Sequence, residues 1–303
     1  MSKVHTPAME KAAKRRSRYN KKGNMDSPFR QAARRLMRNK SALVGLGIIV
    51  VLILLAIFAN VIAPYDPNKP DYTALKQAPS MLHLFGTDAL GRDILSRCLY
   101  GSRVSLLISV ACVITSFFTG GLVGTIAGYR GGRTDNIIMR IMDVFQAIPT
   151  TMMALSMIAV LGNGITQLIV AITISFFAGS ARNFRAAVLS VKSGEFIEAS
   201  KAIDIGTRKM IFRHLIPNAI GIICLFIIGQ LAHGIVIVSS LSYIGVGLQP
   251  PTADWGGILS QGKAYFLAYP HMVLFPAMCI MLAVFGFNLF GNGLRDALDP
   301  RLN

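Results

Sequence analysis

Charged residues are scarce in this 303-residue sequence. Asp, Glu, Lys and Arg make up 15% of it, whereas hydrophobic residues make up 53%. Soluble domains usually contain about 25% charged residues. The missing charge therefore argues against an ordinary soluble enzyme.

Cysteine pairs and metal-binding motifs are also missing. The four cysteines show no CxxC spacing, and three of them lie in apolar runs, so we interpret them as buried free thiols. The five histidines form no HExxH motif and no cluster with carboxylates. We accordingly predict that the chain itself binds no metal or other cofactor.

A nucleotide-binding P-loop is missing as well. Such a loop needs GxxxxGK followed by Ser or Thr, so that backbone amides and the lysine hold phosphates. The nearest string runs from Gly257 to Lys263 and ends in Ala264, which cannot bind magnesium. We predict a chain that has no catalytic residues and is not an enzyme.

Basic residues are plentiful but unevenly placed. The net charge is +17, and 13 of the 31 Lys and Arg residues fall in the first 40 positions, before the first apolar run. A nucleic-acid interface would instead collect them on one face of a folded domain. We therefore exclude nucleic acid as a partner and connect the charge with membrane topology.

Six apolar runs are long enough to suggest helices that cross a membrane, which takes about 20 apolar residues. The first begins too late and is too long for a signal peptide, whose apolar core has about 7–15 residues. The third contains Arg140 and Asp143, which can pair or extend to the interface. The sequence predicts an all-α polytopic membrane protein with about six spans, at residues 43–63, 104–127, 137–161, 165–181, 218–241 and 271–293.

The distribution of Lys and Arg predicts the orientation, because cytosolic loops are rich in these residues. With a cytosolic N-terminus, 25 of them lie inside and six outside. Both termini are then cytosolic. The expected order is a basic tail at 1–40, a first span at 41–63, an extracytoplasmic segment at 64–103, a core of five spans at 104–293 and a short tail at 294–303.

Residues 28–39 have the pattern of a helix lying on the membrane. Ser27 can cap it, and Pro28 suits its first position. Apolar residues then fall on one face and four arginines on the other, which favours a helix in the inner leaflet. A basic tail without fixed structure is the alternative.

The cytosolic connection from 182 to 217 resembles two short amphipathic helices with a break at Ile205 and Gly206. Ser193 and Thr207 can cap them. The apolar faces need burial, either on the membrane and neighbouring helix ends or in a groove of a partner protein. Their members are Phe196, Ala199 and Ile203 in the first helix, and Met210, Ile211, His214 and Leu215 in the second.

This loop resembles the EAA loop of ABC importer membrane subunits. The family pattern is EAA, three residues, glycine, nine residues, isoleucine, one residue, leucine and proline. Glu198, Ala199 and Pro217 match it. The departures are Ser200 for the second alanine, Asp204 for the glycine, and His214 and Ile216 at the final apolar pair; Gly206 can take over the turn.

Three further blocks, at 38–67, 85–106 and 287–303, resemble the second permease subunit of ABC importers for dipeptides, oligopeptides or nickel. The resemblance implies a type I permease fold in a bacterial cell membrane and half of a translocation pathway. It also implies a homologous second permease, two ABC subunits that bind ATP and Mg, and an extracytoplasmic solute-binding protein. The loop at 190–217 would contact the ATPase subunits through Phe196, Glu198, Ala199, Ser200, Ile203, Asp204, Gly206, Ile211, Arg213, His214 and Pro217.

Other readings remain open at this point. Nickel or another small solute fits the same architecture as a peptide. A secondary transporter is less consistent, because the sequence shows no internal repeat and no carboxylates near span centres. A basic membrane-anchored interaction protein would explain residues 1–40 but would not need six spans.

Three smaller features have two readings each. Gly120, Gly124 and Gly128 form a stripe for close helix packing, within the chain or with a sister permease. Charged residues between 85 and 103 can form local ion pairs or contact the binding protein. Polar residues within the spans can line a pathway or bond between helices; these are Gln230, His233 and Asn288.

Overall fold

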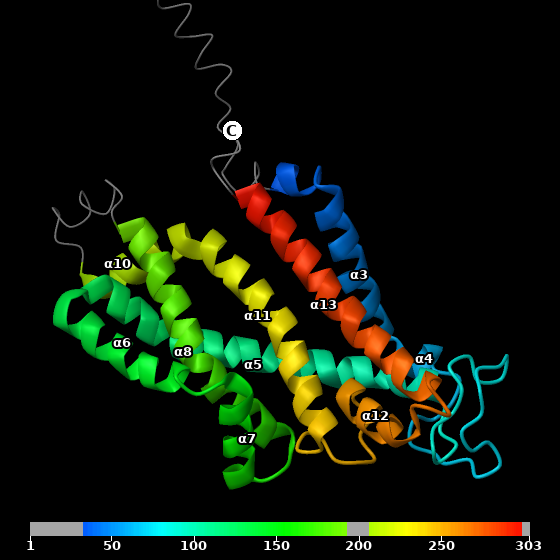
Figure 1. The fold of residues 1–303 in the computed structure, drawn as a ribbon. Coiled ribbons are helices and arrows are strands. Elements are labelled where there is room, and N and C mark those ends of the chain that lie inside the picture. The colour runs from blue at the N-terminus through cyan, green and yellow to red at the C-terminus, as the bar shows by residue number, and fades with distance from the viewer. Residues whose placement is uncertain (1–32, 193–205, 299–303) are drawn as a thin grey trace, which may run out of the picture.

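The computed structural model describes residues 33–192 and 206–298, and most of these are helical, with the segments at 63–93 and 245–254 as the longest exceptions. The expected all-α class is therefore confirmed. Figure 1 shows long tilted helices side by side, with short helices at the lower edge. The elements are α3 (Lys40–Ile57), α4 (Ala59–Ile62), α5 (Ile94–Arg130), α6 (Gly132–Gln146), α7 (Thr150–Leu161), α8 (Ile165–Lys192), α10 (Thr207–Met210), the π-helical turn η1 (Ile211–Leu215), α11 (Ile216–Ile244), α12 (Trp255–Gly262), the 3₁₀ turn η2 (Lys263–Tyr265) and α13 (His271–Leu298).

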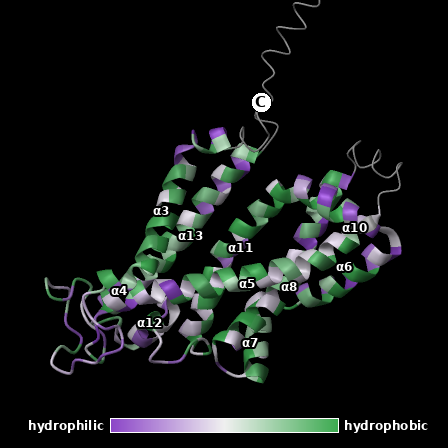
Figure 2. Ribbon diagram, turned by 180° about the vertical axis from the view of Figure 1, so that it is seen from behind, coloured by the Kyte–Doolittle hydropathy of each residue, from purple (hydrophilic) through white to green (hydrophobic). Residues whose placement is uncertain are grey.

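Five of the described helices are long and apolar enough to cross a membrane: α3, α5, α8, η1 with α11, and α13. A sixth span arises if α6 and α7 are counted together. Only 22–39% of the residues in their most apolar windows are buried within the chain. Figure 2 shows hydrophobic residues along the lengths of these helices, as expected for surfaces that face lipid or other subunits.

The expected continuous helix at 137–161 is wrong. The chain breaks between α6 and α7, whose axes differ by 81°. Pro149 explains the break, because proline lacks an N–H donor and disfavours helical geometry in the residue before it. The predicted third span is therefore two helices, α6 and α7, joined through residues 147–149.

Two helices extend well beyond their apolar runs. Helix α5 begins at Ile94, inside the segment expected to be extracytoplasmic, because the Asp93 side chain caps it by accepting a bond of 2.7 Å from the Ser96 amide. Helix α8 continues to Lys192, past the expected end at 181. Of the helix expected at 28–39, residues 33–36 are helical and the part before them lies outside the described residues.

The glycine stripe packs α5 against α8. A Cβ atom on Gly120 would lie 2.5 Å from the Phe177 carbonyl oxygen, and one on Gly124 would lie 1.9 Å from that of Ala181. A Cβ atom on Gly128 would lie 3.0 Å from the Cγ1 atom of Val188. These contacts confirm the internal-packing reading, since only glycine permits such an approach of two helix backbones.

The first and last described spans also pack side by side (Figure 1). A Cβ on Gly45 would lie 2.5 Å from the Phe290 amide nitrogen, and one on Gly293 would lie 2.3 Å from the Ala42 Cβ. At the same end, the Asn39 side chain donates a hydrogen bond of 3.3 Å to Asp296. Helix α3 is thereby held along α13.

The outer segment is held by local ion pairs and hydrogen bonds. Arg92 donates to Asp88 at 2.7 Å, and its other arm donates to Gln261 of α12 at 2.7 Å. Arg103 donates to the carbonyl oxygen of Ala56, at the end of α3. These contacts confirm the local reading of the charges between 85 and 103.

Candidate functional site

The expected coupling residues fall into two groups. Phe196, Glu198, Ala199, Ser200, Ile203 and Asp204 lie outside the described residues. Gly206, Ile211, Arg213, His214 and Pro217 lie in the segment that leads from α10 through η1 into α11. The structure therefore places only the second half of the predicted docking element.

This second half is continuous with a membrane span. The Met210 amide bonds to the Gly206 carbonyl oxygen at 3.0 Å, and the helix then widens into the π turn at Ile211–Leu215. Pro217 accounts for the widening. Its ring would clash with the carbonyl group four residues earlier in a regular α-helix, and it has no N–H to donate to that group. The Asn218 side chain donates a 2.6 Å bond to the His214 carbonyl oxygen. Helix α10, the π turn and α11 therefore follow one another without an intervening loop.

Most of the apolar face predicted for this segment is buried inside the chain. Met210 and Leu215 are completely buried, in a cluster with Val188 of α8. Ile211 packs against the same cluster. For the second helix, the structure thus favours packing on neighbouring helix ends over burial of this face in a partner.

The exposed apolar side chain of the segment is Phe212, which the sequence analysis did not select. Its exposed fraction is 60%. It was missed because it falls off the face shared by Met210, Ile211 and Leu215. The sequence did contain a signal for it. Phe212 is an aromatic residue on the side of the helix opposite the apolar face, where neighbouring helices do not cover it.

Ion pairs fix the helix ends around this segment. Arg185 of α8 makes two hydrogen bonds to Asp135 of α6, at 2.5 and 2.6 Å. The Arg182 side chain donates to Asp143 at 2.8 Å, so Asp143 pairs with α8 and not with Arg140, which was one of two possibilities for that residue. Helices α6 and α8 are thereby joined at two points.

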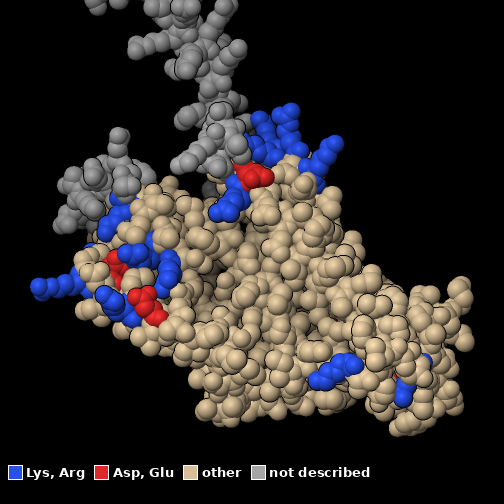
Figure 3. All heavy atoms as spheres, viewed as in Figure 1, with Lys and Arg blue, Asp and Glu red and all other residues tan. Residues whose placement is uncertain are grey.

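Lys192, the last residue of α8, donates to the carbonyl oxygens of Gly128 and Tyr129 at 3.0 and 2.7 Å. These carbonyl groups end α5, where a cation is favourable. Figure 3 shows Lys and Arg gathered over this end of the molecule and over the start of α3, with few at the opposite end. Basic side chains therefore gather at the end of the molecule where α5, α6 and α8 are joined.

Taken together, the fold and this site define a multispan membrane protein with a helical segment at its basic end. Residues 120–303 match the family described as binding-protein-dependent transport system inner membrane component. Residues 27–79 match the N-terminal transmembrane domain of oligopeptide transport permease C. The chain belongs to this family of ABC importer permeases and is a multi-pass inner membrane protein.

Curated relatives align with nearly the whole chain. The oligopeptide transport system permease protein OppC of Bacillus subtilis (strain 168) is 41% identical over 276 residues, which cover 91% of this chain and 90% of the relative. The glutathione transport system permease protein GsiD of Escherichia coli O157:H7 is 40% identical over 281 residues, covering 91% of each. That of Pectobacterium atrosepticum is 37% identical over 277 residues, covering 91% and 92%.

A solved structure has the same fold. A chain of the MetNI methionine ABC transporter, in an inward-facing conformation, matches with a TM-score of 0.52 at 18% identity. The match covers 68% of this chain and 98% of that one. The expected type I permease fold is therefore confirmed.

Proposed function

We propose that this chain is the membrane-spanning subunit of an ATP-driven importer for peptides, di- or oligopeptides, and forms half of its translocation pathway. The observation that supports this most is the alignment over 91% of the chain with permeases for oligopeptides and for the tripeptide glutathione. The chain itself hydrolyses no ATP. Its task is to transmit motion and enclose solute.

The proposed complex contains a homologous second permease, two ATP-binding ABC subunits and an extracytoplasmic solute-binding protein. ATP and Mg belong to the ATPase subunits, and this chain contacts lipid around its spans. The family description, a component of a binding-protein-dependent system, supports the binding protein as a partner. The expected contact with the ATPase subunits lies within residues 190–217, and we add the exposed Phe212 to the contact residues expected there.

The mechanism follows from the continuity of docking segment and span. When ATP closes the two ATPase subunits, the docked segment moves with them. Helix α11 has no proline between Pro217 and Pro250, so it moves as one rod and carries its mid-membrane side chains along. The pathway then opens outward to receive solute.

Affinity purification of the tagged chain from mildly solubilised native membranes tests this function. We expect a second, homologous permease and two P-loop ATPases to copurify, identified by mass spectrometry. The complex in liposomes should then accumulate peptides only with ATP and its binding protein. Recovery of the chain alone, or as a homo-oligomer, would contradict the proposal.

The orientation is a further part of the proposal: the tails at 1–40 and 294–303 are cytosolic and the segment at 64–93 is extracytoplasmic. The clustering of basic residues at the inner end supports it (Figure 3). Thr73 is exposed in the outer segment, so a Thr73→Cys variant should react with a membrane-impermeant maleimide added to intact cells or spheroplasts. The unsubstituted chain provides the background, since its cysteines are buried or half-buried. Labelling confined to inverted vesicles would reverse the topology.

A further inference from the structure

A cavity of about 310 Å³ lies where the broken span meets α8 and α11. Gln146 and Thr150 border the break, Ser175 belongs to α8, and Gln230 and His233 belong to α11. Its volume is at the lower end of the range of small-molecule sites, about 300–1,000 Å³. The cavity therefore has room for a solute and not only for single waters.

The cavity lies beside the middle of α11 and away from the ends of α8. Gln230 is the central residue of α11, about 21 Å from each end at about 1.5 Å per residue. Ser175 is close to the middle of α8, and the break separates two halves of the third span. Three elements thus converge away from their ends, and within a membrane non-helical backbone is tolerated only beside protein or a water-filled cavity.

Polar groups around the cavity have unused hydrogen-bonding capacity. Within the described part of the chain, the side chains of Gln146, Thr150, Gln230 and His233 make no hydrogen bond to another residue. His233 only stacks on Phe176, with ring centroids 5.6 Å apart. Gln146 and His233 are exposed in this chain, and Thr150 and Gln230 are half-buried, so all four can bond to water or to a ligand in the cavity.

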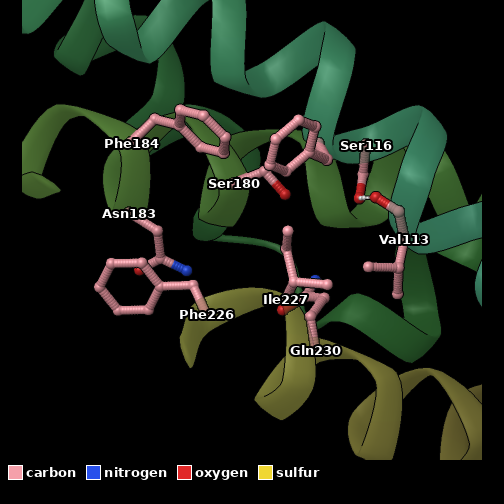
Figure 4. A pocket seen from close by; sticks show the side chains of 9 residues that line it. Val113, Ser116, Ser180, Asn183, Phe184, Phe226, Ile227 and Gln230 are labelled. Atoms are coloured by element: carbon pink, nitrogen blue, oxygen red, sulfur yellow. Dashed lines mark hydrogen bonds between the residues drawn. The ribbon is translucent and has the colours of Figure 1, made fainter. Parts of the chain in front are cut away.

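A second, smaller cavity continues from the same glutamine. Figure 4 shows Gln230 and Ile227 of α11 facing Ser180 and Asn183 of α8. It has a volume of about 20 Å³, enough for a single water. Asn183 is nearer than Ser175 to the Lys192 end of α8, so this second cavity lies on the side of Gln230 that faces the start of α11.

The chemistry of the lining indicates what it binds. None of the described residues that line the larger cavity is Asp, Glu, Lys or Arg. Gln146 and Gln230 each offer both a donor and an acceptor, as a peptide bond does. The start of α7, which has no side-chain cap at Pro149, adds backbone N–H groups beside Thr150.

We propose that this cavity is a transit site for the main chain of a peptide near the bilayer midplane, with Gln146, Gln230 and His233 bonding to peptide groups. The proposal rests on the proposed import of peptides and deepens it. An uncharged lining recognises the repeating main chain and not particular side chains. Binding is then favourable enough to admit the peptide but weak enough to release it, as conduction requires.

Gln230→Leu and His233→Phe test the site in the complete importer, in liposomes with its binding protein. Uptake of an equimolar mixture of tri- to pentapeptides is followed by mass spectrometry. Each variant should lose about three- to tenfold in initial rate, the effect of one hydrogen bond. ATP hydrolysis stimulated by the binding protein, and copurification of the second permease, should be unchanged. Gln249→Leu is the control, since this exposed glutamine lies outside the cavity and bonds only to the Gly245 carbonyl oxygen.

The peptide mixture adds a second readout. Peptides with acidic, basic and neutral side chains should lose rate by the same factor, because the site recognises their common main chain. Loss for one charge class only, or unchanged uptake in both variants, would overturn the proposal. Loss of the second permease from the complex would also overturn it, making the cavity a subunit interface. If the unsubstituted importer takes up no peptide, the proposed function fails and not the site.

Discussion

Gly124→Val is expected to remove nearly all folded permease from the membrane. The first side-chain atom at position 124 would lie 1.9 Å from the Ala181 carbonyl oxygen. A backbone atom in a buried helix cannot move aside as a flexible side chain can, so α5 and α8 must separate. We expect a cost of at least about 3 kcal/mol, the upper end for overpacking.

The amount of permease in the membrane and its elution as a single species in detergent measure this effect. Gly47→Val is the matched control, because a Cβ at position 47 in α3 would have no atom within 4 Å apart from the neighbouring backbone of its own helix. It should accumulate like the unsubstituted chain. Normal yield and elution of Gly124→Val would show that α5 and α8 are not in such close contact.

Phe212→Asp is expected to detach the ATPase subunits and stop transport while the permease stays folded. Phe212 is the exposed aromatic of the described docking segment, and such residues often contribute 2 kcal/mol or more to an interface. A carboxylate in its place would have to lose its hydration in the partner's groove. We expect association at least about thirtyfold weaker, which corresponds to about 2 kcal/mol.

The change in affinity is measured as the binding of purified ATPase subunits to the permease pair in nanodiscs. Leu267→Asp changes an apolar side chain that is 97% exposed in the outer loop, and it should bind the ATPases normally. Ile211→Asp is a poor test, because Ile211 packs against the buried cluster of Val188, Met210 and Leu215. Replacing it would disturb the fold as well as the docking surface. Undiminished binding by Phe212→Asp would place the docking surface elsewhere, with Phe196 the next residue to replace.

The hydropathy pattern predicted the spans well because their signal is local. A charge-free run such as 43–63 needs no knowledge of its neighbours. The glycine stripe was equally readable, since spacing alone puts Gly120, Gly124 and Gly128 on one face. The break at Pro149 was missed because apolar residues continue on both sides of it, and hydropathy does not register a change of direction.

The docking segment was harder to predict because its burial depends on distant residues. Arg182 and Arg185 marked the end of a span in the sequence, yet their pairing with Asp143 and Asp135 lets α8 continue to Lys192. That extension places Val188 against Met210 and Leu215. Without it, Ile211 looked available to a partner and Phe212 did not attract notice.

The pairing of α3 with α13 has a consequence for biosynthesis. The ribosome completes α3 long before its partner exists, since α13 begins roughly 210 residues later, about 10–40 s at ordinary elongation rates. During that time Gly45 and Ala42 of α3 lack the α13 backbone against which they pack in the folded chain. The nascent first span must wait in lipid or beside the insertion machinery, and a chain that stops before residue 271 leaves it permanently unpaired.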